Sequence, residues 1–336
     1  MKYSEEKSVT LPLKQNYVDG LNRMLADRQK HAAEIRKEYS RDIFRDPERY
    51  REDLRSMLGW PLTQPRPAEP PVVAVEELSR EEGYTIYRMQ VQILEDVTMT
   101  GLFFRQDGTE KRPLVLVQHG GGGTPELISG VYGDTANYND MLHRVLKEGV
   151  HVFAPQLLLW RAEEFMDSNR SSLDAWLKRV GSSISAVEIY GLSRILDYFE
   201  TQDYVSTFGM VGVSYGGFYT LYTTAVDTRI RSAISCAYFN QRDVYGWSDW
   251  TWHCSAEKFD DAEVACLAYP RRLCVQVADK DYLFDAPPAE ASALRVRELA
   301  QEVGTDWFDF ILFEGTHEFC RDDAPIHRMV QDLRNA

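Results

Sequence analysis

Short, unbroken runs of apolar residues recur through the last two thirds of the chain, and segments with helical spacing separate them. Leu114-Val115-Leu116-Val117 is the first such run. An unbroken run is typical of a strand buried on both faces of a parallel sheet. The pattern predicts strands at residues 114–117, 151–154, 207–213, 230–238, 273–277 and 307–313, and helices at residues 137–148, 177–200, 215–226, 289–303 and 324–334. Strands that alternate with helices predict an α/β fold with a mostly parallel, doubly wound sheet.

The N-terminal region has helical periodicity. Apolar positions over residues 15–58 recur at helical spacing, and a second helix begins with Asp46 as N-cap and Pro47 at its first position, then ends at Gly59. One face is apolar and the other is charged. We therefore expect these helices to pack on the main body or on a second subunit.

A proline-rich stretch follows and separates two regions of different pattern. The five prolines between residues 61 and 71 predict a stiff, extended linker. Strands are predicted after it at residues 72–75, 84–94 and 97–104, where alternating apolar and polar positions indicate antiparallel pairing with one solvated face. The predicted organisation is an N-terminal helical extension with its Pro-rich linker at residues 1–71, and an α/β domain at residues 72–336.

Composition excludes several classes of protein. The chain has 336 residues, 44% of them hydrophobic, and a formal net charge of −14, so a polyanion such as nucleic acid or an anionic membrane would be repelled. No apolar run is long enough to span a membrane, and no apolar segment follows the N-terminus as in a signal peptide, so we expect a cytoplasmic protein. The five cysteines are widely spaced, and neither a disulfide framework, a metal site nor an organic cofactor is expected.

One of the predicted strands runs directly into a motif that carries chemistry. Residues 210–218 read Met-Val-Gly-Val-Ser-Tyr-Gly-Gly-Phe, which contains Gly-x-Ser-x-Gly between a strand and a helix. Glycine on both sides of the serine lets neighbouring chain pass close to a sharply turned residue, as in a nucleophile elbow. Ser214 is therefore the predicted nucleophile, and its position at a helix N-terminus favours negative charge beside it.

A serine nucleophile requires a base. Of the seven histidines, only His317 directly follows the last predicted strand, and Gly315 before it provides a turn back over the sheet. His253, in a long loop, is the alternative. Helix surfaces or the start of a strand account for His31, His143, His151 and His327.

The base in turn requires an orienting carboxylate, and three aspartates compete for that role after the strand at 273–277. Asp281 is far enough beyond the strand to turn toward His317, whereas Asp279 is closer to the strand and Asp285 is placed to cap the next helix. We favour Asp281. The resulting order along the chain is Ser, Asp, His, which is the order expected when a nucleophile elbow lies in such a sheet.

An oxyanion formed at the serine would need two N–H donors. One is expected from Tyr215, and the other from Gly120 or Gly121 in the glycine-rich loop after the first buried strand. Such a loop could instead bind a phosphate, but no Gly-Lys-Ser/Thr follows it. His119 is expected to brace the loop and to lie beside the substrate pocket.

Two loops are candidates for the substrate pocket. The first contains Trp160 and Arg161, and the second, residues 238–253, contains Trp247 among several aromatic residues. Aromatic faces stack on sugar rings, although a core beneath a long loop or a dimer interface would explain them equally well. Arg161 could bind a substrate carboxylate or form an ordinary ion pair.

Together these motifs resemble the α/β-hydrolase superfamily over about residues 85–335. The bacterial acetyl xylan esterase-like and dienelactone-hydrolase-like branch is the most similar, because residues 259–265 and 269–273 are similar to segments of those proteins. Residues 214–218 are equally similar to the prolyl-oligopeptidase catalytic domain. A serine replaces the nucleophilic cysteine of dienelactone hydrolases, and the N-terminal region is too short for a β-propeller.

The resemblance implies a serine hydrolase that cleaves a small-molecule carboxylic ester, with a short-chain acyl group such as the acetyl group of an acetylated sugar. A peptidase for small peptides and a non-catalytic ligand-binding protein on the same fold are the alternatives. The N-terminal helices are expected to cover the site or to form a subunit interface in a homo-oligomer.

Overall fold

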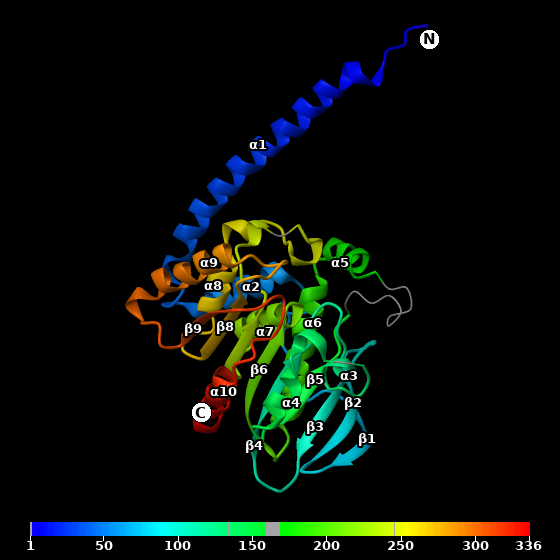
Figure 1. The fold of residues 1–336 in the computed structure, drawn as a ribbon, viewed down its shortest axis with the longest axis vertical. Helices are drawn as coiled ribbons and strands as arrows, with labels where there is room; N and C mark the ends of the chain where they lie inside the picture. The colour runs from blue at the N-terminus through cyan, green and yellow to red at the C-terminus, as the bar shows by residue number, and fades with distance from the viewer. Residues whose placement is uncertain (1, 134, 159–168, 245) are drawn as a thin grey trace.

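A twisted sheet runs through the centre of the protein. The structure, a computed structural model, describes residues 2–133, 135–158, 169–244 and 246–336 (Figure 1). Within these residues the sheet has the order β1-β2-β3-β5-β4-β6-β7-β8-β9. Its strands are β1 (Val73–Glu81), β2 (Tyr84–Leu94), β3 (Val97–Gln106), β4 (Arg112–Gln118), β5 (His151–Pro155), β6 (Val205–Val213), β7 (Ile230–Cys236), β8 (Arg272–Ala278) and β9 (Phe308–Phe313). Strands β1, β2 and β3 pair antiparallel with their neighbours, including β3 with β5. The remaining pairs, from β5 through β4, β6, β7 and β8 to β9, are parallel, as the sequence predicts.

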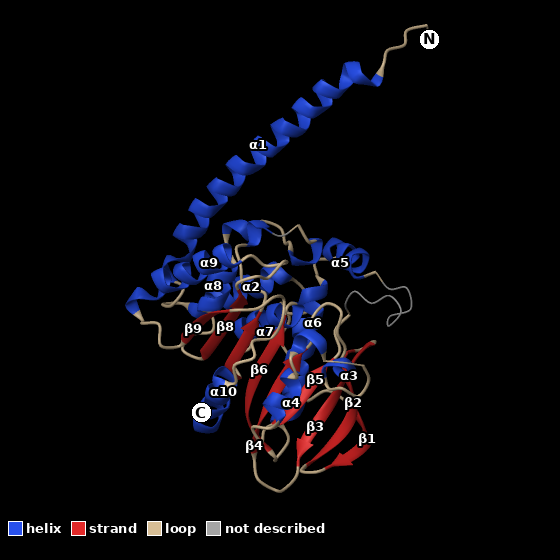
Figure 2. Ribbon diagram, viewed as in Figure 1, coloured by secondary structure: helices blue, strands red, loops and turns tan. Residues whose placement is uncertain are grey.

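Helices cover both faces of this sheet (Figure 2). The helices are α1 (Lys7–Tyr39), α2 (Pro47–Leu58), α3 (Pro125–Ile128), α4 (Met141–Leu146), α5 (Arg170–Arg179), α6 (Ile184–Glu200), α7 (Tyr215–Val226), α8 (Asp261–Cys266), α9 (Ala286–Leu299) and α10 (Ala324–Asn335). One buried apolar cluster joins the sheet to α2, α6, α7, α8 and α9, and a second joins it to α3, α4 and α10. This is the doubly wound arrangement that the sequence predicts. None of the helices in the described segments is both long enough and apolar enough to cross a lipid bilayer.

Two predicted helices are wrong in their extent. The segment 137–148 is broken because Asn139 and Asp140 have positive φ angles of 48° and 56°, so a 3-10 turn, η2 (Ala136–Tyr138), precedes a short α4. The segment 177–200 is interrupted at Gly181, which has a φ of 78°, and α6 restarts with Ser183 as its N-cap. Asn, Asp and Gly adopt these left-handed conformations at the lowest cost, and this local turn chemistry overrides the helical periodicity.

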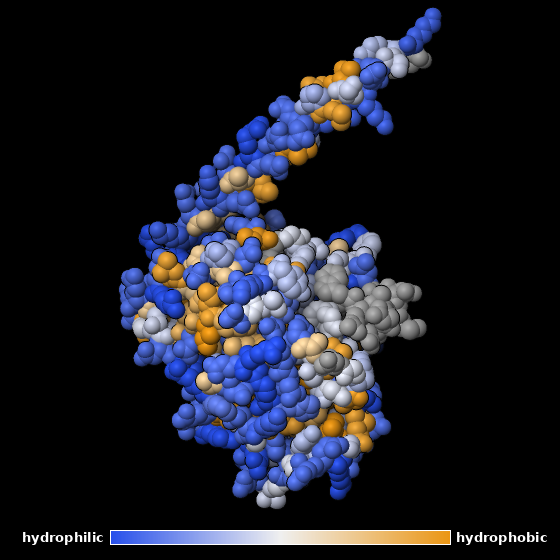
Figure 3. All heavy atoms as spheres, in the orientation of Figure 1, coloured by the Kyte–Doolittle hydropathy of each residue, from blue (hydrophilic) through white to orange (hydrophobic). Residues whose placement is uncertain are grey.

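Helix α1 projects away from the body (Figure 1). Its C-terminal end is attached, because Ala32 is buried and the Arg36 guanidinium donates to the Ala256 carbonyl oxygen (2.6 Å) and to Asp260 (3.3 Å). Along the projecting part, apolar side chains alternate with polar ones on the surface (Figure 3). The exposed apolar residues are Val9, Leu11, Leu13, Tyr17, Val18, Leu21, Met24 and Leu25. The homo-oligomer inferred from sequence stays a prediction.

The rest of the N-terminal extension is bound to the body. The predicted cap of α2 is present, since the Asp46 carboxylate accepts from the Arg49 N–H and Gly59 ends the helix with a φ of 103°. Tyr50, Leu54 and Leu58 are buried in the same apolar cluster as α6 and α7. Residues of the extension therefore form part of the core beneath the α/β sheet.

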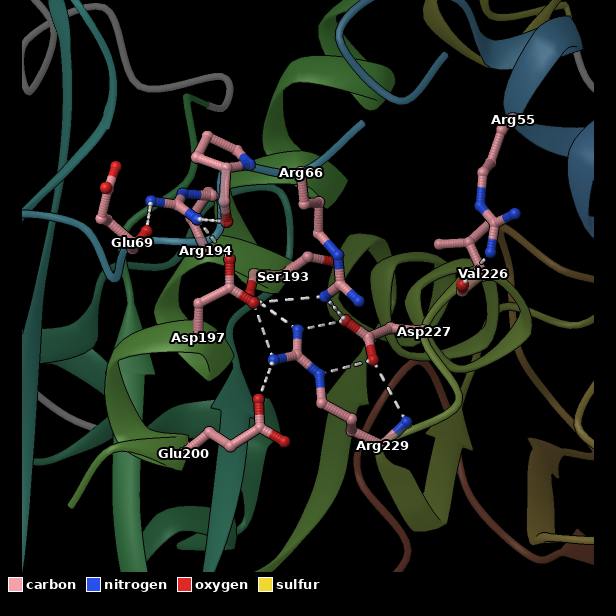
Figure 4. A network of polar contacts seen from close by, with 11 residues as sticks. Arg55, Arg66, Glu69, Ser193, Arg194, Asp197, Glu200, Val226, Asp227 and Arg229 are labelled. Atoms are coloured by element: carbon pink, nitrogen blue, oxygen red, sulfur yellow. Dashed lines mark hydrogen bonds and ion pairs between the residues drawn. The ribbon is translucent and has the colours of Figure 1, made fainter. Parts of the chain in front are cut away.

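A cluster of ion pairs holds the proline-rich linker against the body (Figure 4). The Arg66 guanidinium lies 3.2 Å from Asp197 and 3.3 Å from Asp227, and Arg229 lies 2.7 Å from each of the same carboxylates. Burial alone would raise the pKa of Asp227, but hydrogen bonds from Arg229 and the charges of Arg229 and Arg66 outweigh it, so that the pKa lies below its usual value.

Asp227→Asn is expected to lower the free energy of unfolding by about 2 kcal/mol, because it removes the buried carboxylate shared by Arg66 and Arg229 and leaves Asp197 as the other carboxylate that both arginines contact. Because the pKa of Asp227 is lower in the folded state, its carboxylate stabilises the fold above about pH 4, and this stabilisation is lost as the pH falls further. The difference in free energy of unfolding between wild type and variant should therefore shrink in acid. Urea denaturation at pH 7 and pH 3.5 measures both effects. Glu200→Gln, which removes a 59% exposed partner of Arg229, is the control and should cost less than about 0.5 kcal/mol. Equal costs for the two variants would contradict the prediction.

Candidate active site

Ser214 occupies a strained turn between β6 and α7. Its backbone has φ 59° and ψ −120°, outside the regions that residues with a side chain favour. The turn is held from below, because the Ser214 N–H donates to the Cys236 carbonyl oxygen of β7 (2.9 Å). The side chain is therefore presented at the carboxyl edge of the sheet, directly before the first turn of α7.

Glycines make this turn possible. A Cβ on Gly212 would lie 2.3 Å from the Gly216 carbonyl oxygen, and one on Gly216 would lie 2.2 Å from the Gln118 carbonyl oxygen. Cβ atoms essentially never lie this close to another atom, and the carbonyl oxygens they would meet belong to the backbone, which cannot move aside easily. Strand β6, helix α7 and the loop after β4 thus touch through their main chains at one point, in the close approach that the Gly-x-Ser-x-Gly pattern predicts.

His317 and Asp281 meet at the same edge. Nδ1 of His317 lies 2.8 Å from Oδ2 of Asp281, and both residues are buried. The other Asp281 oxygen accepts the N–H groups of Leu283 (2.8 Å) and Phe284 (3.1 Å), which fixes the carboxylate. With Nδ1 directed at the aspartate, Nε2 is the nitrogen left for proton transfer.

The competing candidates lie elsewhere. Asp279 accepts the Gly315 N–H (3.0 Å) and so stabilises the turn before His317, and Asp285 precedes α9. His253 is exposed, and it is not among the described residues that line the cavity at Ser214. The structure thus brings Asp281, and neither rival aspartate, to His317.

A cavity of about 800 Å³ contains both Ser214 and His317. Its described lining residues are Gly120, Gly121, Gly122, Leu127, Ala136, Asn137, Tyr138, Val213, Ser214, Tyr215, Trp247, Tyr282, Leu283, Thr316 and His317. No hydrogen bond joins Ser214 Oγ to His317 within the described part of the chain. Catalytic hydrogen bonds are often long without substrate and shorten when it binds.

The loop after β4 offers backbone donors to this cavity. The Gly120 N–H is already used, since it donates to the Tyr138 hydroxyl (2.9 Å). The Gly121 N–H has no acceptor among the residues described, and Tyr215 contributes the first N–H of α7. Of the two glycines predicted from sequence, Gly121 is therefore the one whose amide is available to a ligand.

His119 braces that loop from beneath. It is fully buried, its Nε2 accepts the Leu157 N–H (3.2 Å), and its Nδ1 contacts the Gly120 carbonyl oxygen (3.0 Å). Because Nε2 accepts, the proton lies on Nδ1. Burial lowers the pKa of His119 to about 4, which keeps the ring neutral. The bracing role is as expected, but His119 does not line the cavity, and burial behind the loop is the reason.

The residues predicted to line the substrate pocket do not all lie at the cavity. Trp247 lines the cavity and stacks near Tyr215 with ring centroids 6.2 Å apart. Trp250 and Trp252 are buried against Phe218, so most of the aromatic loop is core, the alternative considered for it. Trp160 and Arg161 lie outside the described residues.

Sequence reasoning missed the segment that lies over the His317 loop. Asn137 donates from its side chain to the His317 carbonyl oxygen (3.0 Å) and accepts the Phe319 N–H on its own carbonyl oxygen (2.9 Å). Tyr138 beside it also lines the cavity. The cluster Asn137, Asn139 and Asp140 is a turn signal that could have revealed this segment.

A metal site is not evident in the described ranges. There, no three His, Cys, Asp or Glu side chains are close enough together to hold an ion. The groups that the structure brings to the cavity are a serine hydroxyl, an imidazole with its carboxylate, and backbone amides.

Comparisons with known proteins agree with this geometry at the level of the fold. No protein-family model matches the chain, and no curated protein is similar to it in sequence. Among solved structures, a provisionally assigned acetyl xylan esterase from Bacteroides fragilis superposes with a TM-score of 0.66 at 14% identity, over 87% of this chain and 83% of that one.

Two further solved structures superpose with somewhat lower TM-scores. A glucuronoyl esterase from Solibacter usitatus has a TM-score of 0.60 at 15% identity, over 84% of this chain and 91% of its own. Acetyl xylan esterase 1 from Thermoanaerobacterium has a TM-score of 0.57 at 14% identity, over 85% and 93%. At identities this low, the superpositions show a shared fold and do not carry the neighbours' functions over to this chain. The chain therefore has the α/β-hydrolase fold, as the resemblance in its motifs predicts.

Proposed function

We propose that this protein is a serine hydrolase of carboxylic esters. The observation that carries the proposal is the pair His317 and Asp281, joined at 2.8 Å, at the cavity that also contains Ser214 in its strained turn. In this proposal Ser214 Oγ attacks the ester carbonyl carbon, and His317 Nε2 takes the hydroxyl proton. Asp281 keeps the His317 ring in the required tautomer and stabilises its charged form.

The tetrahedral intermediate places negative charge on the former carbonyl oxygen. We assign its stabilisation to the N–H groups of Tyr215 and Gly121, which is the type of interaction that contributes most to acyl transfer. His317 then gives its proton to the leaving alcohol, and an acyl-enzyme remains on Ser214. Water activated by the same imidazole releases the acid and restores the serine. No step requires a cofactor.

The proposed substrate is a short-chain acyl ester, such as an acetylated sugar. The aromatic and aliphatic side chains of Trp247, Tyr282 and Leu127 line the cavity, and Asn137 adds an amide, which suits a neutral ligand with a ring that stacks. The acetyl xylan esterases and the glucuronoyl esterase among the structural neighbours support an ester substrate attached to carbohydrate.

A panel of p-nitrophenyl esters with increasing acyl length, together with acetylated oligosaccharides, tests the substrate. We expect kcat/KM to be highest for acetyl and propionyl esters and to fall as the chain lengthens. Aminoacyl amides are the comparison that detects a peptidase. Faster cleavage of the amides than of the esters would favour the peptidase alternative and overturn the proposed preference.

A further inference from the structure

Arg170, at the start of α5, is a fully buried cation with four acceptors. Its guanidinium donates to Asp249 Oδ2 (2.7 Å), Glu188 Oε2 (3.0 Å), the Tyr219 hydroxyl (2.7 Å) and the Leu158 carbonyl oxygen. The side chain is 0% exposed. Burying an arginine charge carries a desolvation penalty, and the four acceptors around Arg170 offset it. The proposed reaction does not involve Arg170 directly.

One side of the cluster reaches the residue after the nucleophile. The Tyr215 hydroxyl donates to the same Asp249 oxygen that Arg170 binds (3.0 Å). The Arg170 guanidinium also lies over the Tyr215 ring, 5.2 Å from its centroid. These contacts hold the side chain of Tyr215, whose backbone N–H is one proposed donor to the oxyanion.

The other side reaches the glycine loop. Glu188, which Arg170 binds, accepts the Leu158 N–H at its second oxygen (2.8 Å). The neighbouring Leu157 N–H donates to His119, and His119 in turn contacts the Gly120 carbonyl oxygen. Hydrogen bonds, together with the peptide link between Leu157 and Leu158, therefore connect Arg170 to the loop that carries the Gly121 N–H.

We infer that Arg170 is a positioning residue that fixes the two proposed oxyanion donors, Tyr215 and Gly121, relative to each other. This inference rests on the proposed function. A planar guanidinium can bond in several directions at once, which an ammonium group at the end of a flexible chain cannot reproduce. Small displacements of preorganised donors lower the rate of the chemical step more than they weaken substrate binding.

Arg170→Lys tests the inference, because it keeps the charge and removes the planar fork. We expect kcat for p-nitrophenyl acetate to fall about 10- to 100-fold while KM changes less than about threefold. Arg271→Lys is the matched control. Arg271 is also buried and bonds the carbonyl oxygens of Asp227, Ile230 and Leu267, away from the cavity, so its variant should lose thermal stability but keep kcat within about twofold.

A second variant guards against a folding defect in the first. Asp249→Asn preserves shape and weakens the link between Arg170 and Tyr215, and it should lower kcat in the same direction by a smaller factor. A trifluoromethyl ketone, which forms a tetrahedral adduct with the serine, should lose affinity in both variants in proportion to kcat. Unchanged kcat in both variants, or losses equal to that of Arg271→Lys, would overturn the inference. Absence of ester turnover in the wild-type protein would instead overturn the proposed function.

Discussion

Ser214→Ala is expected to abolish turnover of p-nitrophenyl acetate, with kcat reduced by about four orders of magnitude or more. The alanine removes only the attacking oxygen. Because Ser214 is 7% exposed and its hydroxyl bonds to no described residue, the variant should fold as the wild type does. Initial rates at saturating ester, with far-ultraviolet circular dichroism to verify folding, measure both outcomes.

Ser206→Ala is the control for this experiment, since Ser206 lies on the same strand β6 but its side chain is exposed away from the site. Its activity should match that of the wild type. A fluorophosphonate probe should label the wild type and Ser206→Ala, and leave Ser214→Ala unlabelled. Retained hydrolysis in Ser214→Ala would refute the proposed nucleophile, and a wild-type protein that neither reacts with the probe nor cleaves esters would favour the ligand-binding alternative.

Gly216→Ala is expected to destabilise the protein by about 3 kcal/mol or more, or to prevent folding. The new Cβ would lie 2.2 Å from the Gln118 carbonyl oxygen, and neither atom can move without shifting main chain. Denaturant unfolding followed by tryptophan fluorescence measures the loss.

The same substitution at Gly20 serves as the comparison. The nearest atom to a Cβ there is the end of the flexible Arg23 side chain, at 4.0 Å, and the position lies within exposed helix α1. Alanine favours a helix over glycine, so Gly20→Ala should leave stability unchanged or raise it slightly. If Gly216→Ala were as stable as Gly20→Ala, the tight main-chain contact inferred at the elbow would be wrong.

The sheet and the elbow were predictable because local sequence determines them. The short apolar run at residues 114–117 is typical of a central strand, and Gly212 and Gly216 mark a close approach of main chain that a residue with a side chain would not permit. Asp281 could be preferred over Asp279 because side chains further beyond a strand end reach further over the sheet. Each of these features is marked by a short motif or by its position just after a predicted strand, even where its partner lies far away in the sequence.

Features formed by distant segments were not predictable. Arg170 meets Asp249 and Glu188 from three separate elements, and periodicity carries no information about such a meeting. The sequence of the aromatic loop does not indicate that Trp250 is buried in the core whereas Trp247 lines the cavity, because tryptophan suits a core and a ligand pocket equally well. Helical periodicity over residues 137–148 concealed the turn that brings Tyr138 to the cavity.

The glycine contacts at the elbow have a consequence for how this protein can change over evolution. They tie β6, α7 and the loop after β4 into a floor that tolerates almost no added atoms. Leu127, Trp247 and Leu283, in contrast, line the cavity from three separate segments outside this floor. New substrates would therefore be acquired by exchanging these rim side chains one at a time, while the floor is inherited unaltered.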